Sequence, residues 1–235
     1  MPSIDVCFSP ELLPLYDLKG KIAVAVDVLR ATSSMVTALA HGVTHIAPVS
    51  ELHECLAYKE KNYLVAAERD GVKAEGFDLG NSPFHYREDS VKGRFLAITT
   101  TNGTQAINRS RTADAVLVGA FLNLGAVADY LRKANKDVVV VCAGWKGLFN
   151  LEDTLFAGAL AERLEGDFSL NHDATLAAHS MYQVAKGDLM GYLSKSSHVQ
   201  RLERLHILPD IEFCLQHDVY NVVPVLEGEF LVVAQ

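Results

Sequence analysis

The chain has 235 residues, of which 49% are hydrophobic and 21% charged, a balance typical of a soluble globular protein with a buried core. Its formal net charge of -8 argues against nucleic acid or an anionic membrane as the main partner, because both attract clustered Lys and Arg. An anionic substrate would therefore need cations that are concentrated locally.

The apolar runs are short. Residues 22–26 and 138–143 fall far below the roughly 20 residues that a membrane span requires, so we expect no membrane partner. The N-terminus has no basic segment followed by an apolar one, which favours a cytoplasmic location. The cysteines form no CxxC pair, so we expect free buried thiols instead of a zinc knuckle or a disulfide framework.

Short apolar runs alternate with helical patterns along the chain. Strands covered on both faces are predicted at 22–26, 95–99, 116–118 and 138–142, helices at 33–41, 104–111 and 152–164, and a last strand at 230–233. This order predicts an α/β fold with three layers, α/β/α, around a largely parallel or mixed central sheet.

The strand-loop-helix unit is reused. The segment that starts at Lys21 resembles the segment from Arg94 to Gly119, and a third unit starts at Val138. No Pro, Gly or Ser-rich linker interrupts the chain, so residues 1–235 are predicted to form a single domain. The stretch 68–89 is expected to be an irregular loop, and loops of that length are usually functional or disordered.

Ligands of open α/β sheets bind beyond the carboxyl ends of the strands. After the run 22–26 come Asp27, Arg30 and Thr32. Asp27 could hold a metal and Arg30 an oxyanion, although an aspartate that caps a helix is the alternative for Asp27.

A hydroxyl-rich turn follows the second predicted strand. It reads Thr100, Thr101, Asn102, Gly103, Thr104, and its backbone amides would suit a phosphate or sulfonate. An ordinary Asn-Gly loop with a threonine cap is the alternative. Neither GxxxxGK[ST] nor a GxGxxG followed by an acidic residue is present, so nucleoside triphosphates and dinucleotides are disfavoured.

The fourth predicted strand runs into a turn with Gly144, followed by Glu152 and Asp153 at a helix start. Paired acids there suit a cation, although acids in a first helical turn are also ordinary helix formers. Cys142 is not favoured as a nucleophile, because the Cx₅R loop of phosphotyrosine phosphatases is absent.

The long loop alternates acids, bases and glycines. It contains Glu68, Arg69, Lys73, Asp78, Asn81 and Ser82, with glycines at 71, 76 and 80. Arg69 and Lys73 would supply the local positive charge that the chain as a whole lacks. A solvated loop is the alternative. The histidines show no HxH or HExxH spacing, and oxygen ligands favour Mg²⁺ over zinc.

Four motifs occur in order: Asp-Val-Leu-Arg-Ala-Thr, Glu-Arg-x-Gly-x-Lys-x-x-Gly-Phe-Asp-Leu-Gly-Asn-Ser-Pro, Thr-Thr-Asn-Gly-Thr and Cys-Ala-Gly-Trp. In this combination the chain resembles the 2-phosphosulfolactate phosphatase family over nearly its whole length. The resemblance implies hydrolysis of 2-phospho-3-sulfolactate to 3-sulfolactate and phosphate, with Mg²⁺, on the route to coenzyme M.

Candidate residues follow from these motifs. We expect catalytic roles for Asp27, Arg30, Glu68 and Arg69, substrate contacts from Arg30, Thr32, Lys73, Asn81, Ser82, Thr100, Thr101, Asn102, Gly103, Thr104 and Gly144, and metal ligands among Asp27, Glu68, Asp78, Glu152 and Asp153. The DxDxT motif of haloacid-dehalogenase phosphatases is absent, which favours direct attack by water. A homodimer is expected. A non-catalytic binding module for a small sulfonate or phosphate is the alternative function.

Overall fold

The computed structural model describes residues 1–69 and 71–235. The strands are β1 Ile4–Cys7, β2 Ile22–Val26, β3 His45–Pro48, β4 Leu64–Arg69, β5 Val72–Lys73, β6 Phe95–Thr99, β7 Ala115–Gly119, β8 Val138–Cys142, β9 Pro224–Glu227 and β10 Phe230–Val233. The α-helices are α1 Ala31–Ala40, α2 Leu52–Ala57, α3 Gly103–Arg109, α4 Leu124–Ala134, α5 Leu151–Leu164, α6 Asp173–Ala185, α7 Leu189–Leu193, α8 Ser197–Arg204 and α9 Leu208–Cys214.

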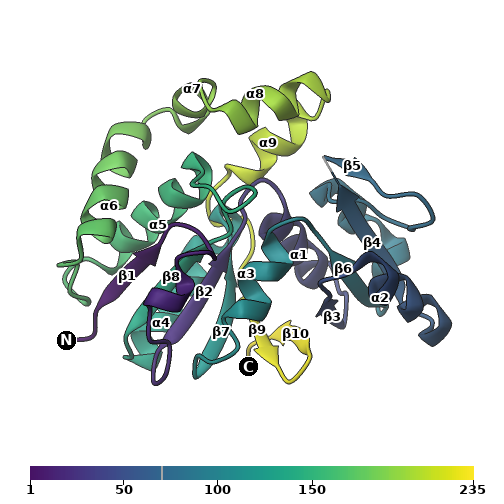
Figure 1. Cartoon of the computed structure of the whole chain (residues 1–235), viewed down its shortest axis with the longest axis horizontal. Helices are drawn as coiled ribbons and strands as arrows, with labels where there is room; N and C mark the ends of the chain where they lie inside the picture. Colours follow the sequence, from purple (N-terminus) through teal and green to yellow (C-terminus); the bar gives the residue numbers. More distant parts are fainter. Residues whose placement is uncertain (70) are drawn as a thin grey trace.

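Within the described residues, the strands form one sheet of ten in the order β1-β8-β2-β7-β9-β10-β3-β6-β4-β5. Strands β1, β8, β2 and β7 form one parallel group, and β3, β6 and β4 form a second. The antiparallel hairpin β9-β10 lies between the groups (Figure 1). It joins each of them through one paired position, Leu117 with Val225 and Leu231 with Ile46. The sheet is therefore mixed.

Helices cover both faces of the first group. Because side chains alternate along a strand, Ile22, Val24 and Val26 of β2 face α4, α5 and α6, whereas Ala23 and Ala25 face α1 and α3. The cluster around α1 and α3 also includes buried side chains of β3 and β6 from the second group. The predicted α/β fold with three layers is confirmed.

The repeated unit connects the two groups of strands. The chain passes from β2 through α1 to β3, and it returns from β6 through α3 to β7, so each copy starts in one group and ends in the other. The predicted strands and helices are present within a few residues of their expected bounds. Strand β3 was implied only by the repeated unit, and strands β1, β4, β5 and β9 and helices α2, α4 and α6 to α9 were not predicted.

The expected irregular loop is partly ordered. It starts within β4 and contains β5 and two 3₁₀ turns, Pro83–Arg87 and Asp89–Val91. Asp70 lies outside the described residues. No helix in the described ranges combines the length and apolar character needed to cross a membrane.

The packing of α5 on α6 generates the first testable prediction. A Cβ atom at Gly158 would lie 2.2 Å from the Ala178 carbonyl oxygen and 2.7 Å from the Tyr182 Cβ. We expect Gly158→Ala to lower the free energy of unfolding by about 1–3 kcal/mol in urea denaturation, because the helices must separate. Gly187→Ala is the matched control, since no atom lies within 4 Å of a Cβ atom there. An equal effect of both substitutions would contradict this account.

Candidate active site

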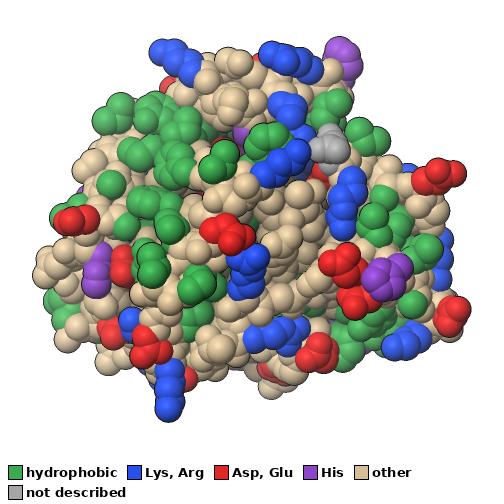
Figure 2. Space-filling view, in the orientation of Figure 1, with side chains coloured by type: hydrophobic (Ala, Val, Ile, Leu, Met, Phe, Trp, Pro, Cys, Tyr) green, Lys and Arg blue, Asp and Glu red, His purple; other side chains and the backbone are tan. Residues whose placement is uncertain are grey.

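A pocket lies where the carboxyl ends of β2, β4, β6 and β8 meet helix α8. Its lining comprises Asp27, Leu29, Arg30, Glu68, Gly71, Asn81, Thr101, Asn102, Gly144, Trp145, His198, Arg201 and Leu202. The strand ends belong to both parallel groups, so the pocket spans the two parts of the sheet. In the space-filling view, Lys and Arg side chains gather below α8 on this face (Figure 2).

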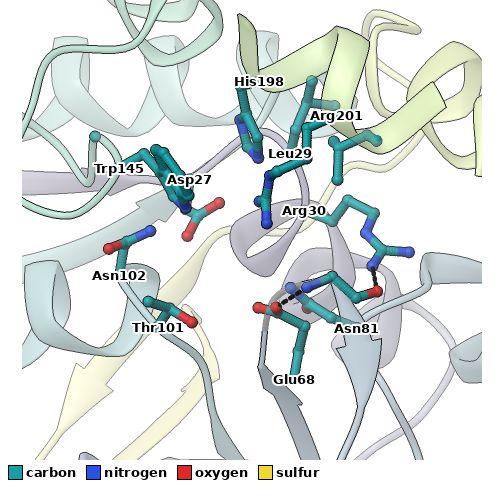
Figure 3. Close-up of a pocket in the computed structure, with 13 residues that line it drawn as sticks. Asp27, Leu29, Arg30, Glu68, Asn81, Thr101, Asn102, Trp145, His198 and Arg201 are labelled. Carbon is teal, nitrogen blue, oxygen red and sulfur yellow. Dashed lines mark hydrogen bonds between the residues drawn. The ribbon is translucent and has the colours of Figure 1, made fainter. Parts of the chain in front are cut away.

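Asp27 follows β2 and is only 8% exposed, with its carboxylate directed into the pocket (Figure 3). The turn between β2 and α1 holds it, because the Asp27 amide donates to Thr32 Oγ1 at 3.0 Å and the Ala31 amide donates to Asp27 Oδ1 at 3.4 Å. Thr32 is completely buried. It therefore positions Asp27. Thr32 does not line the pocket, contrary to the prediction that it contacts the substrate.

The Thr-Thr-Asn-Gly-Thr turn contributes two residues to the pocket lining, Thr101 and Asn102. Thr100 and Thr104 are buried and bond one another: the Thr104 amide donates to Thr100 Oγ1 at 3.2 Å. At Gly103 a Cβ atom would lie 2.8 Å from Asp27 Oδ2 and 2.6 Å from the Ala31 Cβ. Gly103 is therefore the residue that lets α3 approach Asp27 closely.

Two completely buried carboxylates lie at the start of α5. Asp153 accepts hydrogen bonds from the Val28 amide at 2.9 Å, the Gly144 amide at 3.1 Å and Asn150 Nδ2 at 2.9 Å. Glu152 Oε1 contacts His198 Nδ1, while its Oε2 has no hydrogen-bond partner among the described residues. Neither carboxylate lines the pocket, so both lie behind the surface that a ligand would touch.

The pKa values of Asp27 and Asp153 are both raised. Burial raises the pKa of Asp27 to about 6, and the charges of Glu68 and Glu152 add to this rise, whereas His198 and the Ala31 amide oppose it. Burial, Asp27 and Glu152 raise the pKa of Asp153 well above its usual range. Both shifts disfavour the ionised carboxylates, and a cation bound nearby would favour them again.

Arg30 lines the pocket but is held by other parts of the fold. One end of its guanidinium contacts Asp210 of α9, and Nη2 donates to the Gly71 carbonyl oxygen at 3.0 Å. Ser82 Oγ donates to the other oxygen of Asp210 at 3.0 Å. Ser82 and Lys73 line a neighbouring pocket, which also includes Arg30 and Asn81. Asn81 Oδ1 is buried without a partner in the described part of the chain.

The remaining predicted residues are divided between the pocket and its surroundings. Glu68 lines the pocket and accepts a hydrogen bond from the Gly71 amide. Arg69 lies outside the lining and donates to the Glu68 carbonyl oxygen and to Thr99 Oγ1. Asp78 also lies outside, where it pairs with Lys59 at 3.0 Å. The structure therefore brings Asp27 and Glu68 together and leaves Asp78 elsewhere.

Sequence reasoning missed the residues that α8 and the β8 turn contribute. His198 and Arg201 occupy the same face of α8, three residues apart, and the ring of Trp145 stacks with both. The signal for the helix was present: Ser196 caps it by accepting a hydrogen bond from the Val199 amide, and Val199 and Leu202 are buried at helical spacing. Nothing in that pattern shows which pocket the opposite face covers.

The donor set fits a hard cation that takes only a few of its ligands from the protein. Among the described residues, no three His, Cys, Asp or Glu side chains converge on one metal-binding point. Mg²⁺ does not require such a cage, since one or two carboxylates, waters and substrate phosphate oxygens commonly complete its coordination. Asp27 and Glu68 both line the pocket and supply oxygens of the appropriate kind.

The raised pKa of Asp27 generates a prediction about stability. The folded-state value, about 6, exceeds the unfolded-state value of 3.8, so the stabilisation present below about pH 4 is lost as the pH rises through 6. Asn at this position cannot ionise. We expect Asp27→Asn, in EDTA, to raise the free energy of unfolding at pH 7.5 by an amount on the order of 2 kcal/mol, and to change it little at pH 4.

Asp78→Asn is the matched control for that measurement. Although partial burial opposes the shift, the Val65 amide and Lys59 hold the pKa of Asp78 below its usual range. Its contribution to stability is present above the unfolded-state pKa and is lost in acid, so this variant should melt at a lower temperature than the parent at pH 7.5. Equal signs for the two variants at neutral pH would contradict the assignment of Asp27.

Comparisons with known proteins show which family the sequence matches. The family model described as 2-phosphosulpholactate phosphatase matches residues 7–229. A protein of Caldanaerobacter subterraneus subsp. tengcongensis is 42% identical over 218 residues, which cover 90% of each chain. Relatives from Gloeobacter violaceus and Thermotoga maritima are 42% and 40% identical, over 94% of this chain and 94% and 96% of theirs. All three are named Probable 2-phosphosulfolactate phosphatase. This chain therefore belongs to the 2-phosphosulpholactate phosphatase family.

Proposed function

We propose that the protein is a Mg²⁺-dependent phosphatase that hydrolyses 2-phospho-3-sulfolactate to 3-sulfolactate and inorganic phosphate. One observation carries the proposal: a buried, charge-crowded Asp27 faces the same pocket as Arg30, His198 and Arg201. A carboxylate among cations suits a substrate that carries several anionic groups together with a metal ion. The names of the relatives support the choice of substrate.

Magnesium would be held by Asp27 and Glu68. The bound ion would neutralise charge on the phosphoryl oxygens and make an attacking water more acidic. Asp27 itself is positioned to accept a proton from water at Oδ2, the oxygen that has no hydrogen bond among the described residues. Thr101 and Asn102 lie in the same lining and can donate hydrogen bonds to phosphoryl oxygens.

The leaving oxygen needs a proton because an aliphatic alkoxide is a poor leaving group. His198 lines the pocket, and its Nδ1 contacts the buried Glu152 carboxylate. That contact orients the ring, which would leave Nε2 as the atom that donates a proton to the ester oxygen. The nearly parallel ring of Trp145, at 6.4 Å and 15°, covers His198.

The wider assignments follow from the same proposal. Release of sulfolactate would place the protein on a route to coenzyme M, as the family resemblance implies. A homodimer and a cytoplasmic location stay predictions.

Phosphate release is the direct test. We expect turnover of 2-phospho-3-sulfolactate with Mg²⁺, loss of turnover in excess EDTA, and recovery when Mg²⁺ is restored. Asp27→Asn should lose at least about a hundredfold in kcat, because both a metal ligand and the proton acceptor are removed. If no metal supports turnover while 3-sulfolactate still raises the melting temperature, the protein is a binding module and the proposal fails.

The role of His198 predicts a dependence on the leaving group. We expect His198→Gln to lower kcat on 2-phospho-3-sulfolactate roughly 10²–10⁴-fold. The loss should be much smaller on an aryl ester such as 4-nitrophenyl phosphate, whose leaving group departs without a proton donor. An equal loss on both esters, measured as phosphate release, would show that His198 has another role.

A further inference from the structure

The pocket contains a guanidinium group, that of Arg201, to which the described residues offer no anionic partner. Arg201 projects from α8 into the pocket, close to His198 (Figure 3). Its Nε atom is buried, yet it finds no hydrogen-bond partner in the described part of the chain. The same ranges contain no ion pair to Arg201. Arg201 is half-buried, and a buried guanidinium nitrogen without a hydrogen-bond partner is costly, so its presence in a pocket indicates that a ligand completes it.

Arg30 lines the same pocket, but its guanidinium already has partners within the protein. Its guanidinium is occupied by Asp210 and by the Gly71 carbonyl oxygen, contacts that tie α9 and the β4-β5 turn to the start of α1. Arg69 is likewise occupied by backbone and hydroxyl oxygens outside the lining. Of the described arginines that line the pocket, Arg201 is the one free to bind an anion.

Trp145 fixes the orientation of that guanidinium. The Cζ atom of Arg201 lies 4.8 Å from the centroid of the Trp145 ring. The backbone of Trp145 is held in turn, because its amide donates to the Leu148 carbonyl oxygen at 2.8 Å and its carbonyl accepts from the Leu148 amide at 3.0 Å. A planar fork restrained by an aromatic ring is well suited to bind two oxygens of one oxyanion.

We propose that Arg201 binds the sulfonate of the substrate and thereby sets the specificity of the pocket. This inference rests on the proposed function. His198 and Arg201 lie one turn apart on the same face of α8, and both stack with Trp145. If His198 faces the ester oxygen, Arg201 lies on the side of the leaving group and not on the side of the transferred phosphoryl.

The choice of the sulfonate follows from the substrate's own geometry. Its carboxylate is attached to the carbon that bears the ester oxygen, whereas the sulfonate lies one carbon farther from phosphorus. Arg201 lies about one helical turn from His198 along α8. We therefore expect its guanidinium group to reach the sulfonate, the group farther from phosphorus. The sulfonate also stays charged over the whole working pH range, so the half-buried guanidinium would keep its counter-charge.

The test compares the activity of the parent and of its Arg201 variants on two substrates. Between the parent and Arg201→Gln, we expect kcat/KM for 2-phospho-3-sulfolactate to fall roughly 10–150-fold, mainly through KM, as loss of a charge-assisted hydrogen bond predicts. The value for 2-phospholactate, which has the carboxylate but no sulfonate, should change less than about threefold. Arg201→Lys should lose an intermediate amount on the sulfonate, because it keeps the charge without the fork.

Arg204→Gln is the matched control. Arg204 is exposed on the same helix and does not line the pocket, so this variant removes one positive charge without removing the proposed contact. It should behave as the parent on both substrates, and thermal melting of all the variants should show that α8 is folded. An equal fall for Arg201→Gln on both substrates would assign Arg201 to a group that both share, the phosphoryl or the carboxylate, and overturn the proposal.

Product binding separates this inference from the proposed function. Isothermal titration with 3-sulfolactate and with lactate requires no turnover. Tighter binding of sulfolactate by the parent, abolished in Arg201→Gln, would support the sulfonate site even if the protein hydrolysed nothing. Turnover by the parent combined with unchanged sulfolactate affinity in Arg201→Gln would sustain the phosphatase and reject the sulfonate site.

Discussion

The carboxylate of Asp153 connects the segments on which the pocket is built. It receives one amide from the turn after β2, one from the turn after β8, and a side-chain amide from the residue that caps α5. Because Asp153 is completely buried, these donors replace the water that its oxygens would otherwise bind. Asp153 therefore helps to fix the position of Asp27 relative to Gly144, although it does not itself line the pocket.

That arrangement creates a local excess of negative charge. Burial and the charges of Glu68 and Glu152 raise the pKa of Asp27, and burial and the charges of Asp27 and Glu152 raise the pKa of Asp153. One oxygen of Glu152 has no hydrogen bond within the described residues. Such crowding destabilises the metal-free fold at neutral pH and strengthens the attraction for a cation. Stability and function therefore oppose one another at Asp27, as often occurs where a site needs charge that the fold does not neutralise.

Part of the site could be predicted from local sequence. Asp27, Thr101 and Asn102 follow buried strands directly, and the rule that ligands bind at strand carboxyl ends places them in the pocket. Asp78 was also predicted as a site residue but lies outside the pocket, where a nearby lysine and a backbone amide bind its carboxylate. Thr32, Thr100 and Thr104 likewise support the site from behind, since their hydroxyls are consumed in holding turns.

The residues from α8 could not be predicted in the same way. His198 reaches Glu152 across 46 positions of sequence, and only the folding of α7 to α9 over the strand ends brings the two together. The mixed sheet was predictable as a class from alternating apolar runs and helices. Its division into two groups was not, because single paired positions carry the connection through β9 and β10.

That division has a consequence for the order in which the chain can assemble. Residues 224–233, which form the hairpin between the two groups of strands, are synthesised after all the other described strands of the sheet, and α8 precedes them only slightly. During synthesis, each parallel group has its own strands long before the backbone seam between them can form. The pocket draws residues from both groups and from α8, so a nascent chain would acquire its binding geometry only after α8 and the hairpin have emerged.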